Sequence, residues 1–342
     1  MTSRERVLRC LEFDHPDRVP RDLWELPIAR MGLGQAAVDG LRRRFPGDID
    51  GPGVPAPAQL TEGDPYAVGR YRDAWGCVFE SIQAGVIGEV KHPIVDEWRN
   101  LDRVKPPEAL LNLDVAAINR ACAAKDRFLM AGCGPHPFEQ LQFLRGSENV
   151  YMDLAEETPE LLELLRIIHN YYLREAEAWC ATDIDGLQFG DDWGSQRALL
   201  IAPAQWRRLF KPLYKDYCAI AKARGKKVFM HSDGHIFDIY PDLIEIGVDA
   251  VNSQLFCMDI EEIGRRCKGR ITFWGEIDRQ HVLPHGSSDD VRRDVRRVAK
   301  ALFDPAGGVI GQFELGALTT IENASAVFEE WEKIGGTGPD SE

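Results

Sequence analysis

Short apolar runs alternate with longer amphipathic stretches along most of the chain. Residues 148–180 are rich in leucine at helical spacing, and the apolar run 184–190 follows them. The same order recurs, because a helical pattern precedes each of the later apolar runs at 227–231, 248–252, 270–276 and 308–314. Strands that alternate with helices in this way pair in parallel and carry the helices on the outside.

Two earlier runs, at 21–25 and 128–133, raise the number of predicted strands to seven. The pattern therefore predicts an α/β fold, a single (β/α)8 TIM-type barrel over residues 1–334, with its eighth strand not placed. A doubly wound open sheet is the alternative. That fold usually carries a glycine-rich phosphate fingerprint after its first strand, and the fingerprint is missing here.

The segment 27–110 lacks the alternation and is dense in glycine and proline around residues 51–57. We expect it to form an irregular N-terminal elaboration that covers one rim of the barrel and has no fold of its own. Within it, the runs at 75–79 and 88–91 have the pattern of a β-hairpin. Residues 335–342 are expected to form a disordered tail.

Composition narrows the class of protein. With 44% hydrophobic and 28% charged residues, the 342-residue chain has the make-up of a soluble globular protein, and no apolar run is long enough to span a membrane. The net charge of -14 argues against nucleic-acid binding, which needs a basic face. Eight scattered cysteines without a CxxC pair indicate reduced thiols and a cytoplasmic protein.

The chemistry of a parallel barrel gathers where its strands end. The strand at 227–231 ends in His231, and Asp233 projects toward the same side, because side chains alternate along a strand. The alternative is a purely structural role, a turn in which Asp233 caps the next helix. Other strand ends supply further carboxylates, amides and aromatic rings. The candidates at the ends are Trp24, Gln188, Asp192, Trp193, His235, Asn252, Trp274, Glu276 and Glu314.

Several motifs together resemble the uroporphyrinogen decarboxylase superfamily, and more closely its cobalamin-dependent methyltransferase branch. They are GDDWGSQ at 190–196, IAPAQW at 201–206, VFMHSDG at 228–234, PDLIEIGVD at 241–249 and FWGEID at 273–278, with RVP at 18–20 and FLRG at 143–146 as weaker markers. The resemblance implies a (β/α)8 barrel. The decarboxylase branch carries an arginine-rich substrate motif after its first strand, whereas LWELPIAR stands here at 23–30, so true uroporphyrinogen decarboxylation is not expected.

Methyltransferases of this branch resemble zinc enzymes with a His-x-Cys pair at one strand end. Here His231 occupies the first position and Asp233 stands in place of the cysteine. The resemblance implies one Zn²⁺ held by His231, Asp233 and Glu314, with a coordination position left for substrate. The alternative is that the metal has been lost and these residues hydrogen-bond the substrate directly.

The expected activity is transfer of a methyl group from a small O- or N-methylated donor to a corrinoid protein, since the chain has no evident cobalamin module. Asp192, Glu276 and His231 are the expected catalytic residues. The expected substrate contacts are Gln188, Trp193, Trp274, Trp24, Asn252 and His235. Two alternatives are a lyase or decarboxylase acting on a small carboxylate, with Asp192 and Glu276 as acid and base, and a non-catalytic ligand-binding barrel. Family resemblance favours a homodimer.

Overall fold

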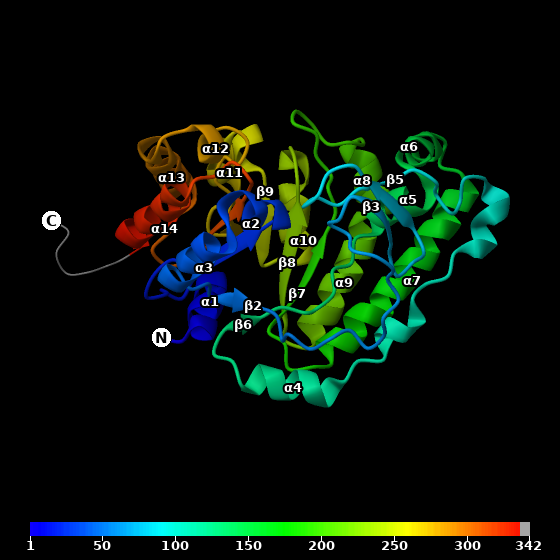
Figure 1. Cartoon of the computed structure of the whole chain (residues 1–342), viewed down its shortest axis with the longest axis horizontal. Coiled ribbons are helices and arrows are strands. Elements are labelled where there is room, and N and C mark those ends of the chain that lie inside the picture. The colour runs from blue at the N-terminus through cyan, green and yellow to red at the C-terminus, as the bar shows by residue number, and fades with distance from the viewer. Residues whose placement is uncertain (336–342) are drawn as a thin grey trace.

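Eight parallel strands form the centre of the computed structural model, which describes residues 1–335. Figure 1 shows strands at the centre of the molecule with helices around them. Six of the strands form one sheet in the order β1-β11-β10-β9-β8-β7, and β2 pairs with β6. The bounds of the strands are β1 Arg21–Glu25, β2 Ile49–Asp50, β6 Phe128–Leu129, β7 Gly186–Gly190, β8 Lys227–Ser232, β9 Ala250–Ser253, β10 Thr272–Trp274 and β11 Val309–Leu315.

Single contacts join the two sheets into a barrel. A parallel bridge between Met130 and Gly186 links β6 to β7, and the amide of Asp48 donates to the carbonyl of Arg21 at 2.8 Å beside β2 and β1. The predicted (β/α)8 barrel is therefore confirmed. Its eighth strand is β2, which lies inside the segment 27–110.

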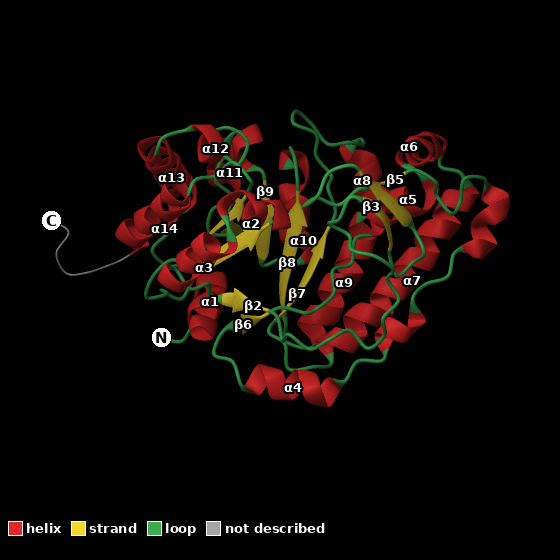
Figure 2. Ribbon diagram, in the orientation of Figure 1, coloured by secondary structure: helices red, strands yellow, loops and turns green. Residues whose placement is uncertain are grey.

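Helices surround the strands, as the colouring by secondary structure makes plain (Figure 2). The longest is α7, Pro159–Cys180, which packs against α9, Lys211–Ala223. The other α-helices are α1 Ser3–Glu12, α2 Pro27–Leu33, α3 Gln35–Arg44, α4 Val115–Ala123, α5 Pro137–Arg145, α6 Ser147–Glu156, α8 Pro203–Leu209, α10 Tyr240–Ile246, α11 Ile260–Cys267, α12 Val282–His285, α13 Ser288–Leu302 and α14 Ile321–Gly335. Short 3-10 turns lie at Trp98–Arg103, Glu108–Leu111, Phe237–Ile239 and Leu255–Cys257.

The rest of the segment 27–110 contains a small antiparallel sheet of β3 Gly69–Arg72, β4 Val78–Ser81 and β5 Glu89–Val90. The expected hairpin is its β4–β5 pair. Phe79 packs on Phe143 of α5 with ring centroids 5.1 Å apart, and the turn at Gly85 lies against Ile28 of α2. The single-domain division stays a prediction. Gly335 ends α14 and does not belong to a tail, and residues 336–342 lie outside the described part of the chain.

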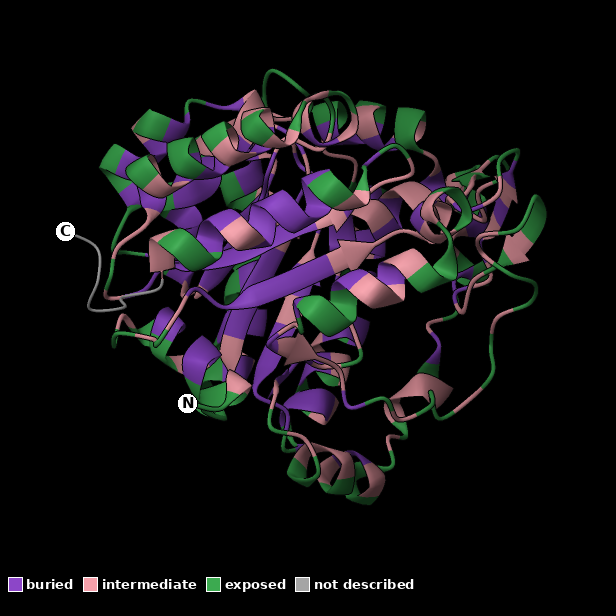
Figure 3. Ribbon diagram, turned by 60° about the vertical axis from the view of Figure 1, so that its left-hand side comes forward, coloured by how far each residue is buried: buried purple, intermediate pink, exposed green. Residues whose placement is uncertain are grey.

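Two apolar layers hold the barrel together. Inside it, Phe128, Phe229, Trp274 and Ile310 pack on one another and on Val7 of α1. The side chains of opposite parity, such as Leu187 and Phe189, pack outward on the helices. The strands are accordingly buried along most of their length while the helices show exposed outer faces (Figure 3). Alternation along each strand thus leaves His231, two positions beyond Phe229, on the interior side at the barrel mouth.

Candidate functional site

Three side chains converge where β7 and β8 end. In the parallel register Gly190 lies opposite His231, so the residues just beyond both strands share one rim. One ligand atom each from Asp192, His231 and Asp233 lies within 4.8 Å of the others. The His231 Nε2 atom is 3.5 Å from Asp192 Oδ1 and 3.7 Å from Asp233 Oδ1.

The amide of Asn252 fixes the tautomer of His231. Asn252 Nδ2 donates to the Trp274 carbonyl and, at 2.9 Å, to Gln312 Oε1, which leaves Oδ1 facing the imidazole. The Nδ1 atom of His231 lies 2.7 Å from that oxygen. Because an amide oxygen only accepts, Nδ1 carries a proton, and Nε2 is the ring atom that faces the two aspartates.

His231 Nε2 and the two carboxylates face a common point, where a divalent metal would find three ligand atoms. Asp233 Oδ1 is buried and has no hydrogen-bond partner within residues 1–335. The Asp233 amide donates to Asp192 Oδ1 at 2.8 Å, which holds the second carboxylate toward the same point. An imidazole and two carboxylates form a ligand set used by Zn²⁺ and by harder divalent ions. Asp192, His231 and Asp233 are therefore the residues that fit a metal.

Arg279 connects this group to two further carboxylates. Its guanidinium hydrogen-bonds Asp233 Oδ2, lies 3.0 Å from Glu276 Oε1 through Nε, and lies 3.1 Å from Glu314 Oε1 through NH1. Glu314, predicted as a metal ligand, is thus not in the cluster that fits a metal and contacts the guanidinium. Asp192 takes its place in the donor set.

Glu276 is the most buried carboxyl of this group, at 4% exposure. Burial, opposed by Arg279 and assisted by Asp233 and Glu314, raises its pKa to about 8. Since Arg279 occupies Oε1, the proton sits on Oε2 at neutral pH. With Glu276 neutral, Asp192, Asp233 and Glu314 face a single guanidinium, which leaves two formal negative charges that a divalent cation would balance.

Two tryptophans, Trp24 and Trp274, lie below His231 on the barrel side of the site. The Trp24 ring lies 5.1 Å from the His231 ring and 4.9 Å, edge to face, from Trp274. Both indole N–H groups donate to Asp22 Oδ2, at 3.0 and 2.9 Å. Burial raises the pKa of Asp22 to about 6 despite these bonds. Trp24 is half-buried beside His231, whereas Trp274 is enclosed in the barrel, so only Trp24 is placed to touch a substrate.

A cavity of about 350 Å³ lies beside Asp192, and β5 and Phe143 are also part of its lining. Its wall includes Glu139 of α5. The neighbouring Asp191 is fully buried and accepts from the Glu139 amide at 2.8 Å and the Tyr214 hydroxyl at 2.6 Å. Asp191 therefore anchors the start of α5, and the cavity offers space for a small substrate next to Asp192.

The remaining predicted contacts occupy different surroundings. Trp193 is fully buried, stacks on Phe138 at 4.0 Å and donates to the Tyr214 hydroxyl, so it belongs to the core between barrel and helices. Asn252 is buried and acts through His231. Gln188 is half-buried in the barrel below Gly190, and His235 is half-buried with Nδ1 unpartnered within residues 1–335.

Sequence reasoning missed Arg279 and Asp22. Asp22 shares the parity of Trp24 on β1, so the alternation contained a signal for it. Arg279 lies three residues beyond Glu276 in the loop after β10, where only its closeness to the strand end pointed to the site.

The uroporphyrinogen decarboxylase (URO-D) family model matches residues 72–333. Among solved structures, a methyltransferase from Methanosarcina mazei is similar over 97% of this chain and 99% of its own, with a TM-score of 0.63 and 16% identity. D-psicose 3-epimerase is similar over 69% of this chain and 84% of its own, with a TM-score of 0.37 and 11% identity. At such identities the likeness concerns the fold alone. No curated protein sequence matches the chain. Within residues 1–335 no helix has the length and apolarity for crossing a membrane. Since the matched residues make up more than half of the 342, the chain belongs to the uroporphyrinogen decarboxylase family.

Proposed function

We propose that the chain is a methyltransferase that moves a methyl group from a small O- or N-methylated donor to a corrinoid protein. The observation that supports it best is the cluster of Asp192, His231 and Asp233 beside a carboxyl that retains its proton at neutral pH. Methyl donors of this kind react slowly unless the departing oxygen or nitrogen gains a proton or a positive charge nearby. The site offers groups for both.

The position of each residue in the site indicates its role. Asp192, His231 and Asp233 would hold a Zn²⁺ or similar ion, which when bound supplies a Lewis acid for the leaving atom. Glu276 holds a proton on Oε2 and can release it to a leaving group. Trp24 shields one side of His231 from water, and the cavity beside Asp192 receives the donor. The cobalamin acceptor arrives on the partner protein.

The alternative is a lyase or decarboxylase acting on a small carboxylate. Such a substrate needs a free cationic group at the mouth. Arg279 already contacts Asp233, Glu276 and Glu314. Arg30 and Arg42, which follow β1, both contact Glu25. The acidic mouth therefore favours a neutral or cationic methyl donor over a polycarboxylate.

Two measurements on the native protein test the proposal. Elemental analysis should find about one divalent metal per chain, and loss of that metal on chelation should stop methyl transfer. Methyl transfer to a purified corrinoid protein, followed by the absorbance change of cobalamin, should be seen with at least one member of a panel of methyl ethers and methylamines. If no donor methylates the corrinoid protein while a small carboxylic acid loses CO₂, the lyase replaces this proposal.

The proposal includes a homodimer and a cytoplasmic location. Sedimentation of the purified chain tests the first, and a single species at the monomer mass would remove it.

A further inference from the structure

A second cavity, of about 500 Å³, lies at the opposite end of the barrel, among the amino ends of β6, β7 and β8. Five cationic side chains line it, against the carboxylates of Glu12, Asp183 and Asp185. The cations are Arg4, Lys125, Arg127, Lys226 and Lys227. A local excess of positive charge is unusual in a chain whose net charge is -14.

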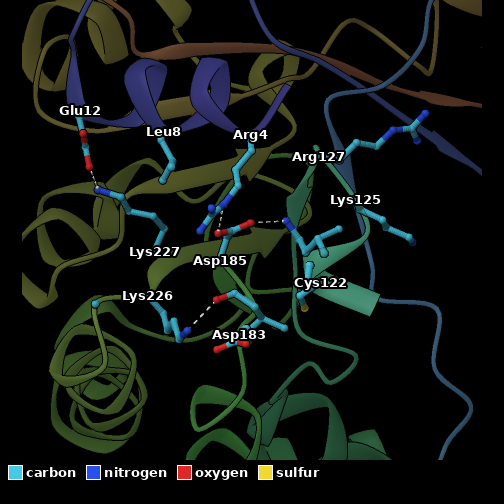
Figure 4. A pocket seen from close by; sticks show the side chains of 14 residues that line it. Arg4, Leu8, Glu12, Cys122, Lys125, Arg127, Asp183, Asp185, Lys226 and Lys227 are labelled. Carbon is cyan, nitrogen blue, oxygen red and sulfur yellow. Dashed lines mark hydrogen bonds and ion pairs between the residues drawn. The ribbon is translucent and has the colours of Figure 1, made fainter. Parts of the chain in front are cut away.

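The cations come from three separate parts of the fold. Arg4 lies on α1, Lys125 and Arg127 lie between α4 and β6, and Lys226 and Lys227 lie where β8 begins. Figure 4 shows Lys226 and Lys227 on one side of Arg4 and Asp185, with Lys125 and Arg127 on the other. The backbone amide of Lys227 donates to the Asp185 carbonyl at 2.9 Å. This bond holds the Lys226–Lys227 segment next to Asp185.

Part of this charge is neutralised within the protein. Arg4 Nε donates to Asp185 Oδ1 at 2.6 Å, and Lys227 Nζ donates to Glu12 Oε1 at 2.7 Å. Outside the lining, Asp50 accepts from Lys125 at 3.0 Å. Each of these pairs offsets one cation.

Other donors in the cavity remain uncommitted. Lys226 Nζ donates only to the Ile184 carbonyl, at 2.8 Å, and forms no ion pair within residues 1–335. The nearest carboxylate oxygen to Arg127 is that of Asp50, at 3.9 Å, beyond hydrogen-bond distance. Within the same residues, the two terminal nitrogens of Arg4 donate no hydrogen bond. Asp183 is the one lining carboxylate that forms no ion pair there, so an anion would meet more positive than negative charge.

We propose that this cavity binds a small phosphorylated molecule, with Lys226 and the terminal nitrogens of Arg4 on one side and Arg127 on the other as its phosphate contacts. Arginine and lysine donors together suit phosphate oxygens, the first as a planar fork and the second as a point charge. The volume exceeds that of a single phosphate and falls within the range of small-molecule sites. Leu8, Leu129 and Ile184 in the lining offer apolar contact to the remainder of the ligand.

The proposal is independent of the methyl-transfer proposal, because the cavity lies at the amino ends of the strands whose other ends lead to Asp192 and His231. Inorganic pyrophosphate and AMP are the probes, titrated calorimetrically into the native protein in phosphate-free buffer, with adenosine as the probe without phosphate. We expect saturable binding of at least one phosphorylated probe that weakens with added salt. Pyrophosphate as the tighter ligand would indicate an inorganic phosphate source, and AMP an organic one.

Matched variants locate the site. The double substitution Lys226→Gln with Arg127→Gln should weaken binding about tenfold or more, equivalent to about 1.4 kcal/mol. Lys215→Gln, an exposed lysine on α9 outside the cavity, should leave it unchanged. Metal content should be equal in all three proteins. Absence of saturable binding by both phosphorylated probes, equal affinity in the double variant, or equal binding of adenosine and AMP would each overturn the proposal.

Discussion

The Nδ1 atom of His231 lies 2.7 Å from the amide oxygen of Asn252, and this contact decides what the other ring nitrogen can do. With a proton held on Nδ1, Nε2 is the ring atom that faces Asp192 and Asp233. Two carboxylates that face one another repel, and positive charge at the point they share with Nε2 relieves that repulsion. The barrel mouth is therefore organised for a cation by a residue, Asn252, that is itself buried.

The first prediction concerns that amide. Asn252→Ala removes the acceptor that orients the ring, so His231 can rotate or shift its proton to Nε2. We expect metal affinity to fall about 10- to 100-fold, the usual effect of losing a partner that orients a metal ligand. Competition with a chelating dye measures the affinity. Asn149→Ala on α6 is the control, because within residues 1–335 its side-chain amide hydrogen-bonds only the Arg145 carbonyl. An unchanged affinity in Asn252→Ala would show that the ring is held by other contacts.

The second prediction separates two candidate ligand sets. Asp192→Asn should remove stoichiometric metal, because its Oδ1 atom lies 3.5 Å from His231 Nε2. Glu314→Gln should retain metal, because Glu314 contacts Arg279. Elemental analysis after gel filtration gives the answer. The opposite result, with metal lost only in Glu314→Gln, would restore the ligand set His231, Asp233 and Glu314 expected from the sequence.

The third prediction tests the histidine itself. His231→Ala should abolish both metal content and methyl transfer, since it removes the only nitrogen ligand of the cluster. Cys257→Ala should preserve both, because Cys257 is outside the metal cluster and its thiol, within residues 1–335, hydrogen-bonds only the Gln254 carbonyl, at 3.1 Å. Metal analysis and the cobalamin absorbance assay on the same preparations make the comparison. Activity that survives in metal-free His231→Ala would mean that the site works through hydrogen bonds alone.

The regular parts of this fold were predictable from the sequence because seven strands lie in apolar runs. β6 and β2 have two residues each, but Phe128–Leu129 begins the apolar run 128–133, whereas Ile49–Asp50 leads into glycine and proline and has the pattern of a loop. Its place in the barrel follows from pairing with β6, which is tertiary information. Because β2 is so short, the segment 27–110 that contains it shows no strand pattern at this point and was expected to be irregular.

The site was predictable in part for a related reason. Alternation and the rule that chemistry gathers at strand ends selected Asp192, His231 and Asp233, whose positions depend on regular strands. Trp193 follows the same strand as Asp192, but its ring points outward and stacks on Phe138. That direction depends on tertiary packing, which the strand pattern does not contain. Arg279 lies in a loop, where no periodicity indicates the direction of a side chain.

The fourth prediction concerns Arg279. Its guanidinium contacts the carboxylates of Asp233 and Glu314 and the carboxyl of Glu276, so Arg279→Met leaves the two charged groups without their cation in a partly buried site. We expect a loss of about 3 kcal/mol in the free energy of unfolding at neutral pH, measured with urea. The loss should shrink in added salt, which screens the repulsion between the remaining carboxylates. Arg265→Met, which breaks an exposed pair with Glu262, should leave stability nearly unchanged. A deficit that is equal at low and high salt would rule out charge repulsion as its cause.

The last prediction follows from the proton on Glu276. Burial raises its pKa to about 8 in the folded protein, whereas the unfolded chain releases that proton near its ordinary value of 4.5. The folded state thus binds more protons between these values, so this carboxyl's contribution to stability is complete below about pH 4.5 and is lost as pH rises through about 8. Methyl transfer that needs the acid form should decline over the upper part of the same range.

Glu276→Gln tests both consequences, because glutamine resembles the protonated acid in shape yet has no proton to give. Urea unfolding between about pH 5 and pH 8 should show a weaker dependence of stability on pH than in the unmodified protein. Methyl transfer should fall by about 10² to 10⁴ below pH 8, the usual contribution of a general acid, and the difference should narrow at higher pH as the unmodified protein loses its acid form. Glu148→Gln on the exposed face of α6 should alter neither quantity. Should Glu276→Gln retain full turnover while its stability profile flattens as expected, the carboxyl would hold its proton without donating it, and the leaving group would have to be activated by the group that Asp192, His231 and Asp233 bind.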